Sequence, residues 1–216
     1  MARPKNQTLR PSLIQAASRI FAEQGFQAAS MTAVGERAGV TKGGVYFHFA
    51  SKEELFFAVL DHWRGALREA VQRADRPGRP AAQRLRARLA AWLEFHFTYP
   101  VAARVQAVLG SELEGRFSAQ LRDDQRAQAR LLRQELRGLL SEGLADGSLT
   151  VVDPALAGFL LAASLEGIVA ERLRGGGVGE LFLDAEALAD ALLAPYRTGV
   201  RHDHAALPGE SFQPPF

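Results

Sequence analysis

The chain has 216 residues, 47% hydrophobic and 23% charged, a composition typical of a soluble globular protein that can bury a core without cross-links. It contains no cysteine, which excludes disulfides, thiolate metal sites and cysteine nucleophiles. The net charge is only +2, but residues 1–52 hold seven basic and two acidic side chains (+5), and residues 53–216 have a net charge of −3. This asymmetry is compatible with a polyanionic partner for the first segment and equally with an unevenly charged surface.

The first 50 residues predict three helices. PSLIQAASRIFAEQ, at residues 11–24, has apolar side chains at helical spacing, and Gly25 closes this helix. Ser30 is a suitable cap for a short helix over residues 31–38, and Gly39 suits a left-handed turn after it. Thr41 can cap a third helix from residue 42 to about residue 48.

A fourth, longer helix follows at once. Ser51 and Glu54 in SKEE form a capping box, the usual signature of a helix N-terminus. Apolar residues recur along this helix at near-helical spacing until DRPGRP, at residues 75–80, which is the clearest linker in the chain.

Beyond the linker, five more helices are expected, and only SLTVV at residues 148–152 has the pattern of a short strand. The predicted helices cover residues 81–97, 101–113, 117–147, 154–174 and 184–196. The fold is therefore expected to be all-α with about nine helices. We expect a helix-turn-helix head at residues 1–52, a helical body at 53–200 joined by the helix from Ser51, and a flexible tail at 201–216.

The segment AGVTKGGVYFHF, at residues 38–49, is the most informative motif. Two short helices joined by a turn that contains glycine, the second with polar residues at its start, are typical of a DNA-binding helix-turn-helix. Candidate DNA-binding residues are those with a side chain or a bare backbone suited to bases or phosphates: Thr41, Lys42, Gly43, Gly44, Tyr46, His48 and, in the next helix, Lys52. The glycines would let the backbone approach the sugar-phosphate wall.

Other residues of this segment are expected to hold it in place. Val45 and Phe49, four residues apart, are predicted to face inward, and Tyr46 and His48 to face outward. Phe47 either packs on the domain or touches a thymine methyl group, and packing is favoured. Alternatively, the glycines mark a loop and the rings belong to a core; the two caps, the turn and the basic charge together favour the DNA-binding interpretation.

Residues 10 to about 60 closely resemble the DNA-binding domain of the TetR family of bacterial regulators. The stretch AGVTKGGVYFHFASKEEL keeps the family pattern almost intact, and the resemblance covers about a quarter of the chain. It implies a three-helix head that reads a palindromic DNA operator, and a body that forms a homodimer and binds a small effector. Gly35 stands where the family usually has alanine, which would loosen the second helix, and Gly44 replaces a usual alanine or threonine. The motif also resembles the γ-butyrolactone receptor branch.

The body carries weaker signals. The segment ALAGFLLAASLEGIVA is rich in small residues that let helices approach closely, so we expect it to form the dimer interface together with ALADALLAPY. An internal core helix would have the same composition. Candidate pocket residues are bulky side chains with a polar group and acids within apolar runs, although packing would explain each: Trp92, Phe95, His96, Tyr99, Glu112, Phe117 and Glu166. Such a pocket would suit an apolar or aromatic ligand.

The remaining signals favour a DNA-binding regulator over other classes. The pair His202 and His204 has no supporting ligands, so neither a metal nor a cofactor is expected. RLRARLAAW is interpreted as an ordinary amphipathic helix rather than a membrane-surface one. No signal-peptide core is present, and the apolar run 154–165 is short for a membrane span, so we expect a cytoplasmic protein without membrane contact. A helical enzyme and a non-DNA interaction protein are the alternatives; no nucleophile elbow, HExxH or phosphate loop supports an enzyme.

Overall fold

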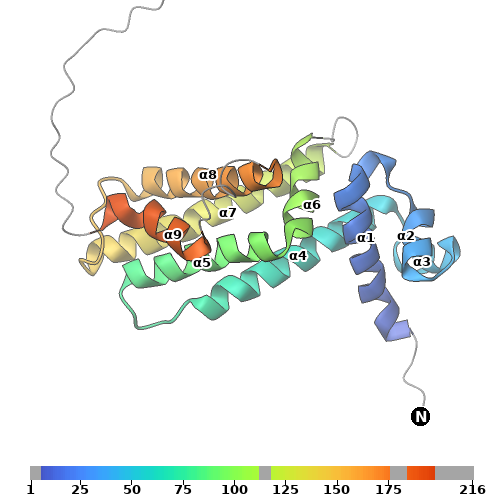
Figure 1. Ribbon diagram of the computed structural model, residues 1–216, viewed down its shortest axis with the longest axis horizontal. Coiled ribbons are helices and arrows are strands. Elements are labelled where there is room, and N and C mark those ends of the chain that lie inside the picture. Colours follow the sequence, from blue (N-terminus) through green and yellow to red (C-terminus); the bar gives the residue numbers. More distant parts are fainter. Residues whose placement is uncertain (1–5, 112–117, 176–183, 198–216) are drawn as a thin grey trace, which may run out of the picture.

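The computed structural model describes residues 6–111, 118–175 and 184–197, and within them the chain is all-α, as predicted (Figure 1). The nine helices there are α1 (Asn6–Ala28), α2 (Met31–Ala38), α3 (Lys42–His48), α4 (Lys52–Ala74), α5 (Ala81–Thr98), α6 (Pro100–Ser111), α7 (Ser118–Ala145), α8 (Pro154–Leu173) and α9 (Ala185–Leu193), followed by a 3₁₀ turn (Ala194–Tyr196). Residues 148–152 form no strand: Leu149 makes one isolated antiparallel bridge to Arg197.

The caps predicted for the first helices are present. The side chains of Ser30 and Thr41 each accept a hydrogen bond from the N–H three residues further on, at 3.1 and 3.2 Å. Gly39 adopts the left-handed conformation after α2, with φ 72°. Gly25, with φ 77° and ψ 176°, breaks the helical conformation near the end of α1, as its position predicted.

The capping box at the start of α4 is also present, with one difference. Ser51 Oγ accepts from the N–H of Glu54 at 3.1 Å. The Glu54 carboxylate accepts in return from the N–H of Ala50 at 2.7 Å, one residue before the cap. These local bonds fix the turn between α3 and α4.

Helices α1 to α3, which we call the head, form a compact unit against the first half of α4 (Figure 1). Their shared apolar core centres on three rings, with Phe21 and Phe26 stacked at 5.9 Å and Phe56 edge-on to both. Val105 and Val108 of α6 are buried in the same core, which ties the head to the rest of the chain.

The long helix α4 belongs to both regions. Its first half packs into the head core, and its second half packs along α5. Midway, Trp63 donates its indole N–H to Ser18 Oγ of α1 at 3.1 Å, while its ring contacts Tyr99 with centroids 5.7 Å apart. Since α4 packs in both regions, it does not mark a boundary between them. The domain boundary between residues 52 and 53 stays a prediction.

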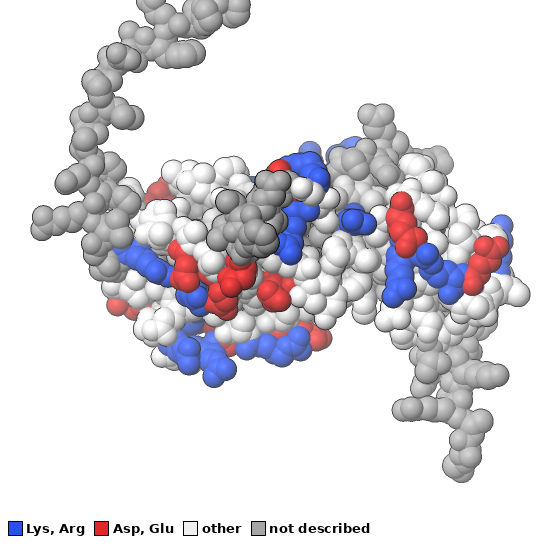
Figure 2. All heavy atoms as spheres, viewed as in Figure 1, with Lys and Arg blue, Asp and Glu red and all other residues white. Residues whose placement is uncertain are grey.

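Helices α5 to α9, which we call the body, form a bundle with its own core. In Figure 1, α7 and α8 lie side by side along the top, and α9 packs on α5 below them. The face shown in Figure 2 carries basic and acidic side chains intermingled over the body.

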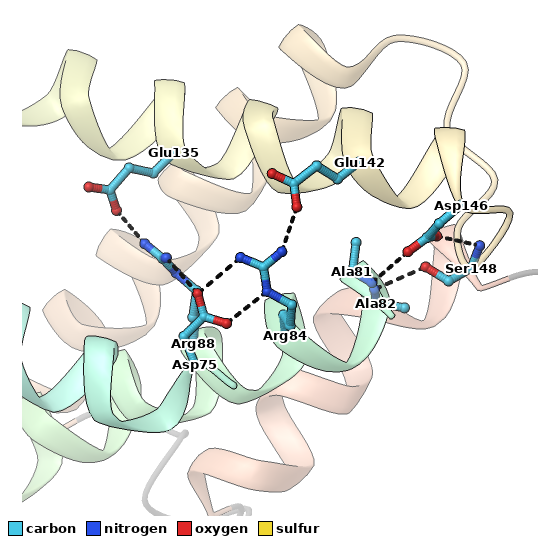
Figure 3. A network of polar contacts seen from close by, with 9 residues as sticks. All are labelled: Asp75, Ala81, Ala82, Arg84, Arg88, Glu135, Glu142, Asp146 and Ser148. Carbon is cyan, nitrogen blue, oxygen red and sulfur yellow. Dashed lines mark hydrogen bonds and ion pairs between the residues drawn. The ribbon is translucent and has the colours of Figure 1, made fainter. Parts of the chain in front are cut away.

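An ion-pair network joins the end of α4 to α5 and α7 (Figure 3). Asp75 accepts from Arg84 at 2.8 Å and from Arg88 at 3.2 Å, and each arginine also pairs with a glutamate of α7 at 2.6 Å, Glu142 and Glu135 respectively. The hydrogen bond from Arg84, reinforced by Arg88, lowers the pKa of the Asp75 carboxyl below 3.8 despite its burial. The network therefore fixes one end of the bundle.

The first turn of α5 is capped from a distance. Its own N-cap residue is Pro80, which has no capping side chain. Instead, Asp146 accepts from the N–H of Ala81 at 2.8 Å and Ser148 Oγ accepts from the N–H of Ala82 at 3.1 Å (Figure 3). The turn after α7 therefore holds the start of α5.

Helix α8 divides its small residues between two faces. Ala157, Gly158 and Ala162 are buried, and a Cβ built on Gly158 would lie only 3.2 Å from a backbone nitrogen of α7. The prediction that all the small residues form a dimer surface is therefore wrong for these three, since they let α7 approach closely. The opposite face leaves Phe159 and Leu160 each 48% exposed.

By length and composition alone, the whole of α8 could cross a membrane, although the uncharged run 154–165 is shorter than a membrane span. Its most apolar window extends past Glu166 and has a mean hydropathy of 1.4, with 33% of the window buried inside the chain. Core helices of soluble proteins pass the same test. The packing of α8 along α7 accounts for the buried part.

Candidate DNA-binding surface and ligand cavity

Two residues anchor helix α3 in the head core, and most of its other residues are exposed to solvent. Val45 and Phe49 are fully buried in the head core, as predicted. Tyr46 is 45% exposed, and Thr41 and Lys42 are exposed at the N-terminal end of the helix. The structure therefore brings three of the residues predicted for DNA binding, Thr41, Lys42 and Tyr46, onto one accessible surface.

The glycines of this region serve different purposes. A Cβ on Gly43 would meet only the Thr41 hydroxyl, at 3.8 Å, and one on Gly44 would make ordinary contacts from 3.4 Å outward. A Cβ on Gly35 would lie 2.9 Å from the Val40 carbonyl oxygen and 3.2 Å from Val45. Gly35 therefore lets α2 and α3 pack closely. The sequence had suggested that it would loosen α2. The fold itself does not require Gly43 or Gly44.

Two of the basic side chains of the head are neutralised within the chain. Arg37 forms an ion pair with Glu23 at 2.9 Å. Lys52 donates to the carbonyl oxygens of Phe26, Gln27 and Ala29 at 2.8, 3.1 and 3.0 Å, which uses all three of its N–H groups.

The ammonium of Lys52 also lies 4.6 Å above the Phe26 ring. Lys52, which was predicted to contact DNA, ties α4 to the end of α1 through these bonds. Lys42 differs: it lies 5.8 Å from the Tyr46 ring and has no ion pair in the part of the chain that the structure describes.

Two aromatic predictions on α3 need correction. Phe47, for which packing was favoured, is 75% exposed, since α3 turns Val45 and Phe49 toward the core and Phe47 away from it. His48 was expected to face outward, but it is half-buried and its Nε2 is enclosed without a hydrogen-bond partner. Phe47 is thus available at the surface, whereas Nε2 of His48 is not.

The body contains a cavity of about 1010 Å³ between α4, α5, α6, α7 and α8. This volume lies at the upper end of the range for small-molecule sites. Of the predicted pocket residues, Trp92, His96 and Glu166 line it. Phe95 and Tyr99 do not; they stack on each other and on Trp63 at the junction with α4. Glu112 and Phe117 lie outside the described residues.

His96 is the most deeply buried polar residue of the cavity wall, at 3% exposure. Its Nδ1 lies 2.8 Å from the Trp92 carbonyl oxygen, and its ring lies 4.0 Å from the Trp92 ring. Burial lowers the pKa of His96, although the Trp92 carbonyl partly opposes this, so the ring is neutral near pH 7. Nδ1–H then donates to the carbonyl, and the buried Nε2 has the Gln106 side chain nearby but makes no hydrogen bond of normal geometry.

The residues that sequence reasoning missed are arginines. Seven of them line the cavity, against three glutamates, and six come as pairs with i,i+4 spacing on one helix: Arg64 with Arg68, Arg84 with Arg88, and Arg122 with Arg126. This spacing places both members of a pair on one helix face and was the available signal. It was overlooked because arginine usually marks a solvated surface.

No group of three or more histidine, aspartate and glutamate side chains could hold a metal among the residues described. His202 and His204 lie outside that part of the chain.

Two family models match this chain. The sequence model for "Bacterial regulatory proteins, tetR family" matches residues 13–59. The model for "Tetracyclin repressor-like, C-terminal domain" matches residues 78–170. The chain belongs to the TetR family. TetR proteins are DNA-binding transcriptional regulators rather than enzymes, and they bind small-molecule effectors.

Individual relatives cover the chain only in part. FasR, an HTH-type transcriptional activator of Mycolicibacterium smegmatis, is 42% identical over 86 residues, which span 40% of this chain and 39% of FasR. The A-factor receptor protein of Streptomyces griseus is 46% identical over 50 residues, 23% of this chain and 18% of the receptor. The γ-butyrolactone receptor branch therefore stays a prediction.

A solved structure extends the likeness to the whole TetR fold. The transcriptional regulator FadR from Bacillus subtilis, in complex with stearoyl-CoA, has a TM-score of 0.71 at 20% identity, covering 88% of this chain and 98% of that one. At this identity the likeness shows the fold.

Proposed function

We propose that the protein is a homodimeric repressor that binds a palindromic DNA operator and is released by a small molecule in the body cavity. The observation that carries this proposal is the free surface of α3, whose polar residues Thr41, Lys42 and Tyr46 stand outward while Val45 and Phe49 anchor the helix. Thr41 and Tyr46 supply hydroxyl groups for bases or phosphates, and Lys42 supplies a cation. Gly43 and Gly44 let the backbone approach DNA closely.

Phe47 and Lys52 take different roles from those the sequence suggested. Phe47, exposed beside this surface, is suited to contact a thymine methyl group. Lys52 positions the head by holding the end of α1, and does not contact phosphate. We leave His48 out of the DNA contacts because its Nε2 is enclosed.

The exposed apolar face of α8 supports the homodimer. Leu156, Phe159 and Leu160 are about half exposed, next to Ala163 and Gly167, and an apolar helix face of this kind is typically covered by a partner. We propose that α8 and α9 of two copies make a four-helix interface through this face. Two heads are needed because one head covers too little DNA for tight, specific binding.

Helix α4 is the element through which a ligand could act on DNA binding. Its residues Leu55 and Phe56 are buried in the head core, while Leu67 and Val71 line the cavity. A ligand that favours one position of α4 would shift the head, provided that it binds that state more tightly than the DNA-bound state. FadR, which shares the fold, was crystallised with stearoyl-CoA, and this supports a small-molecule ligand for this chain.

Repression is proposed over activation because a bound dimer can block transcription by occupying its operator, with no further surface. We also propose that the protein acts in the cytoplasm, where its DNA partner lies. The alternative of an interaction protein without DNA binding is disfavoured by the exposed polar groups kept on α3.

The first experiment recovers bound duplexes from a random pool with the full-length protein and measures affinity for the recovered sequence by fluorescence anisotropy. We expect a palindrome with half-sites about one helical turn, ~34–36 Å, or a multiple of it apart. Tyr46→Ala should weaken binding about tenfold or more, and Tyr46→Phe should lose only the hydroxyl contribution. Unchanged binding by Tyr46→Ala would refute the proposed role of α3.

A second experiment tests the dimer. Phe159→Glu should convert the dimer to monomers in sedimentation velocity, because it places a charge in an apolar interface. Leu144→Glu is the matched control, since Leu144 is equally exposed, at 49%, but lies on α7 and not on α8. A dimer that survives Phe159→Glu would exclude this interface.

A further inference from the structure

The two ends of the cavity differ in how their arginines are satisfied. At the end near the α4–α5 linker, Arg84 and Arg88 are both bound to Asp75 and to a glutamate of α7 (Figure 3). Three carboxylates balance these two cations. This end is a closed ionic network and has no positive charge left for a ligand.

The other end is marked by Arg64, which pairs with Asp124 of α7 at 2.6 Å and so places this part of α4 beside the start of α7. Arg68 follows Arg64 by one turn, and Arg122 lies close to Asp124 in sequence. Both line the cavity, are exposed, and have no ion pair within the described ranges. Arg126 has only a distant, solvent-exposed pair with Asp123 at 3.5 Å.

We call Arg68, Arg122 and Arg126 the arginine rim. Gln72 and Gln125 line the cavity on the same two helices and can donate further hydrogen bonds. One acid, Glu166 of α8, also lines the cavity without an ion pair among the residues described. Because α8 packs antiparallel to α7, with Gly158 beside Arg137, Glu166 lies toward the rim end. Three arginines against two carboxylates, Glu166 and the Asp123 that pairs with Arg126, still leave the rim with a net positive charge.

Between the two ends, the wall is largely apolar. Leu89, Leu136, Leu165 and Val169 line it together with Trp92. His96 and Gln106 add polar groups at the edge of this region: the two side chains lie close together, and the buried Nε2 of His96 makes no hydrogen bond of normal geometry.

We propose that the cavity binds an amphipathic anion, with a carboxylate or phosphate head group on the arginine rim and an apolar chain along the wall toward the α4–α5 end. This inference rests on the proposed function, in that it names the chemical class of the small molecule that would act on α4. The net positive rim at one end and the neutralised network at the other orient the ligand, because the rim gathers the most uncompensated charge for its head group. The remaining cavity arginine, Arg133, donates to the Ala129 carbonyl oxygen and lies 5.9 Å from the Phe159 ring.

The test uses four probes that share one chain and differ in the head group: dodecanoate, dodecyl phosphate, dodecanol and dodecyltrimethylammonium, each below its micelle-forming concentration. Calorimetry on the full-length protein should show the anions binding at least tenfold more tightly than the alcohol, and the cation most weakly. Their advantage should shrink as salt is raised. The tighter of the two anions identifies the head group. Equal binding of dodecanol and both anions would overturn the proposal.

Single variants locate the head group. Arg122→Gln should weaken dodecanoate or dodecyl phosphate binding about three- to tenfold and leave dodecanol unchanged. Glu166→Gln should strengthen binding of the anions, because it removes the opposing charge. Arg137→Gln, an exposed arginine of α7 outside the cavity, is the matched control. An Arg122→Gln variant that loses dodecanol and the anions equally would refute a head group at the rim.

Operator release is measured separately with the recovered duplex. Anions that bind tightly without releasing the duplex would uphold the ligand class and refute ligand control of DNA binding. Failure of all probes to bind, with duplex binding intact, would refute the ligand class and leave the DNA-binding role untouched.

Discussion

The head and the body both carry many basic side chains, and in each region some are neutralised within the chain while a few are not. In the head, Arg37 and Lys52 are bound by a carboxylate and by three carbonyl groups, while Lys42 stands free of ion pairs within the described residues. In the body, Arg84 is satisfied, while Arg68 has no ion pair there. In both proposals, the cations without internal ion pairs, rather than the total charge, mark the place where an anion would bind.

The strongest test of this distinction is Lys52→Met. The variant leaves three carbonyl oxygens at the end of α1 without their donor, so the free energy of unfolding should fall by about 3 kcal/mol in urea titrations. Lys42→Met is the matched control and should leave stability within about 0.5 kcal/mol. If both variants lost the same free energy of unfolding, the two lysines would contribute equally to stability and the proposed distinction would be wrong.

Two glycines of the head can be compared in the same way, one needed for packing and one proposed to allow access to DNA. Gly35→Ala should lower the free energy of unfolding by about 2 kcal/mol, because the new Cβ would lie 2.9 Å from a backbone oxygen. Gly43→Ala has open space and should be as stable as the parent or slightly more so. If Gly43→Ala proves as damaging as Gly35→Ala, then Gly43 is needed by the fold and not for access to DNA.

In the body, Asp75→Asn tests the satisfied arginines. It should lower stability by about 1–2 kcal/mol at pH 7, since Asp75 is only 13% exposed and holds two arginines. The pKa of Asp75 is lowered by Arg84, so this contribution is complete above pH 3.8 and is lost as pH falls through the lower pKa of the folded state. The parent and the variant should therefore converge in acid unfolding curves. A gap that persists at the lowest pH would assign the effect to packing.

The head was largely predictable because its signals are local. Ser30, Thr41 and Ser51 cap at fixed offsets, and Gly39 turns the chain where its sequence position requires. The contacts of Lys52 were not predictable because they join residues far apart in the sequence. Lys52 is bound by the carbonyl groups of residues 26, 27 and 29, which no helical spacing reveals.

The cavity was less predictable for the same reason. Trp92, His96 and Glu166 were identified from their chemistry, but Phe95 and Tyr99 are turned toward Trp63 by the packing of α5 on α4. The cavity arginines lie on several helices and are brought together only by the bundle. Their different pairing depends on carboxylates far away in sequence, so composition alone did not separate the rim from the network.

The most direct measurement of the central claim is the salt dependence of operator binding by Lys42→Met and by the parent protein. If Lys42 neutralises a phosphate, the variant should bind more weakly across all sequences, and the slope of log affinity against log salt should fall by about one per head. Arg37→Met, which removes a cation already paired with Glu23, should leave the slope unchanged. A Lys42→Met slope equal to that of the parent, or the same fall in Arg37→Met, would contradict the account.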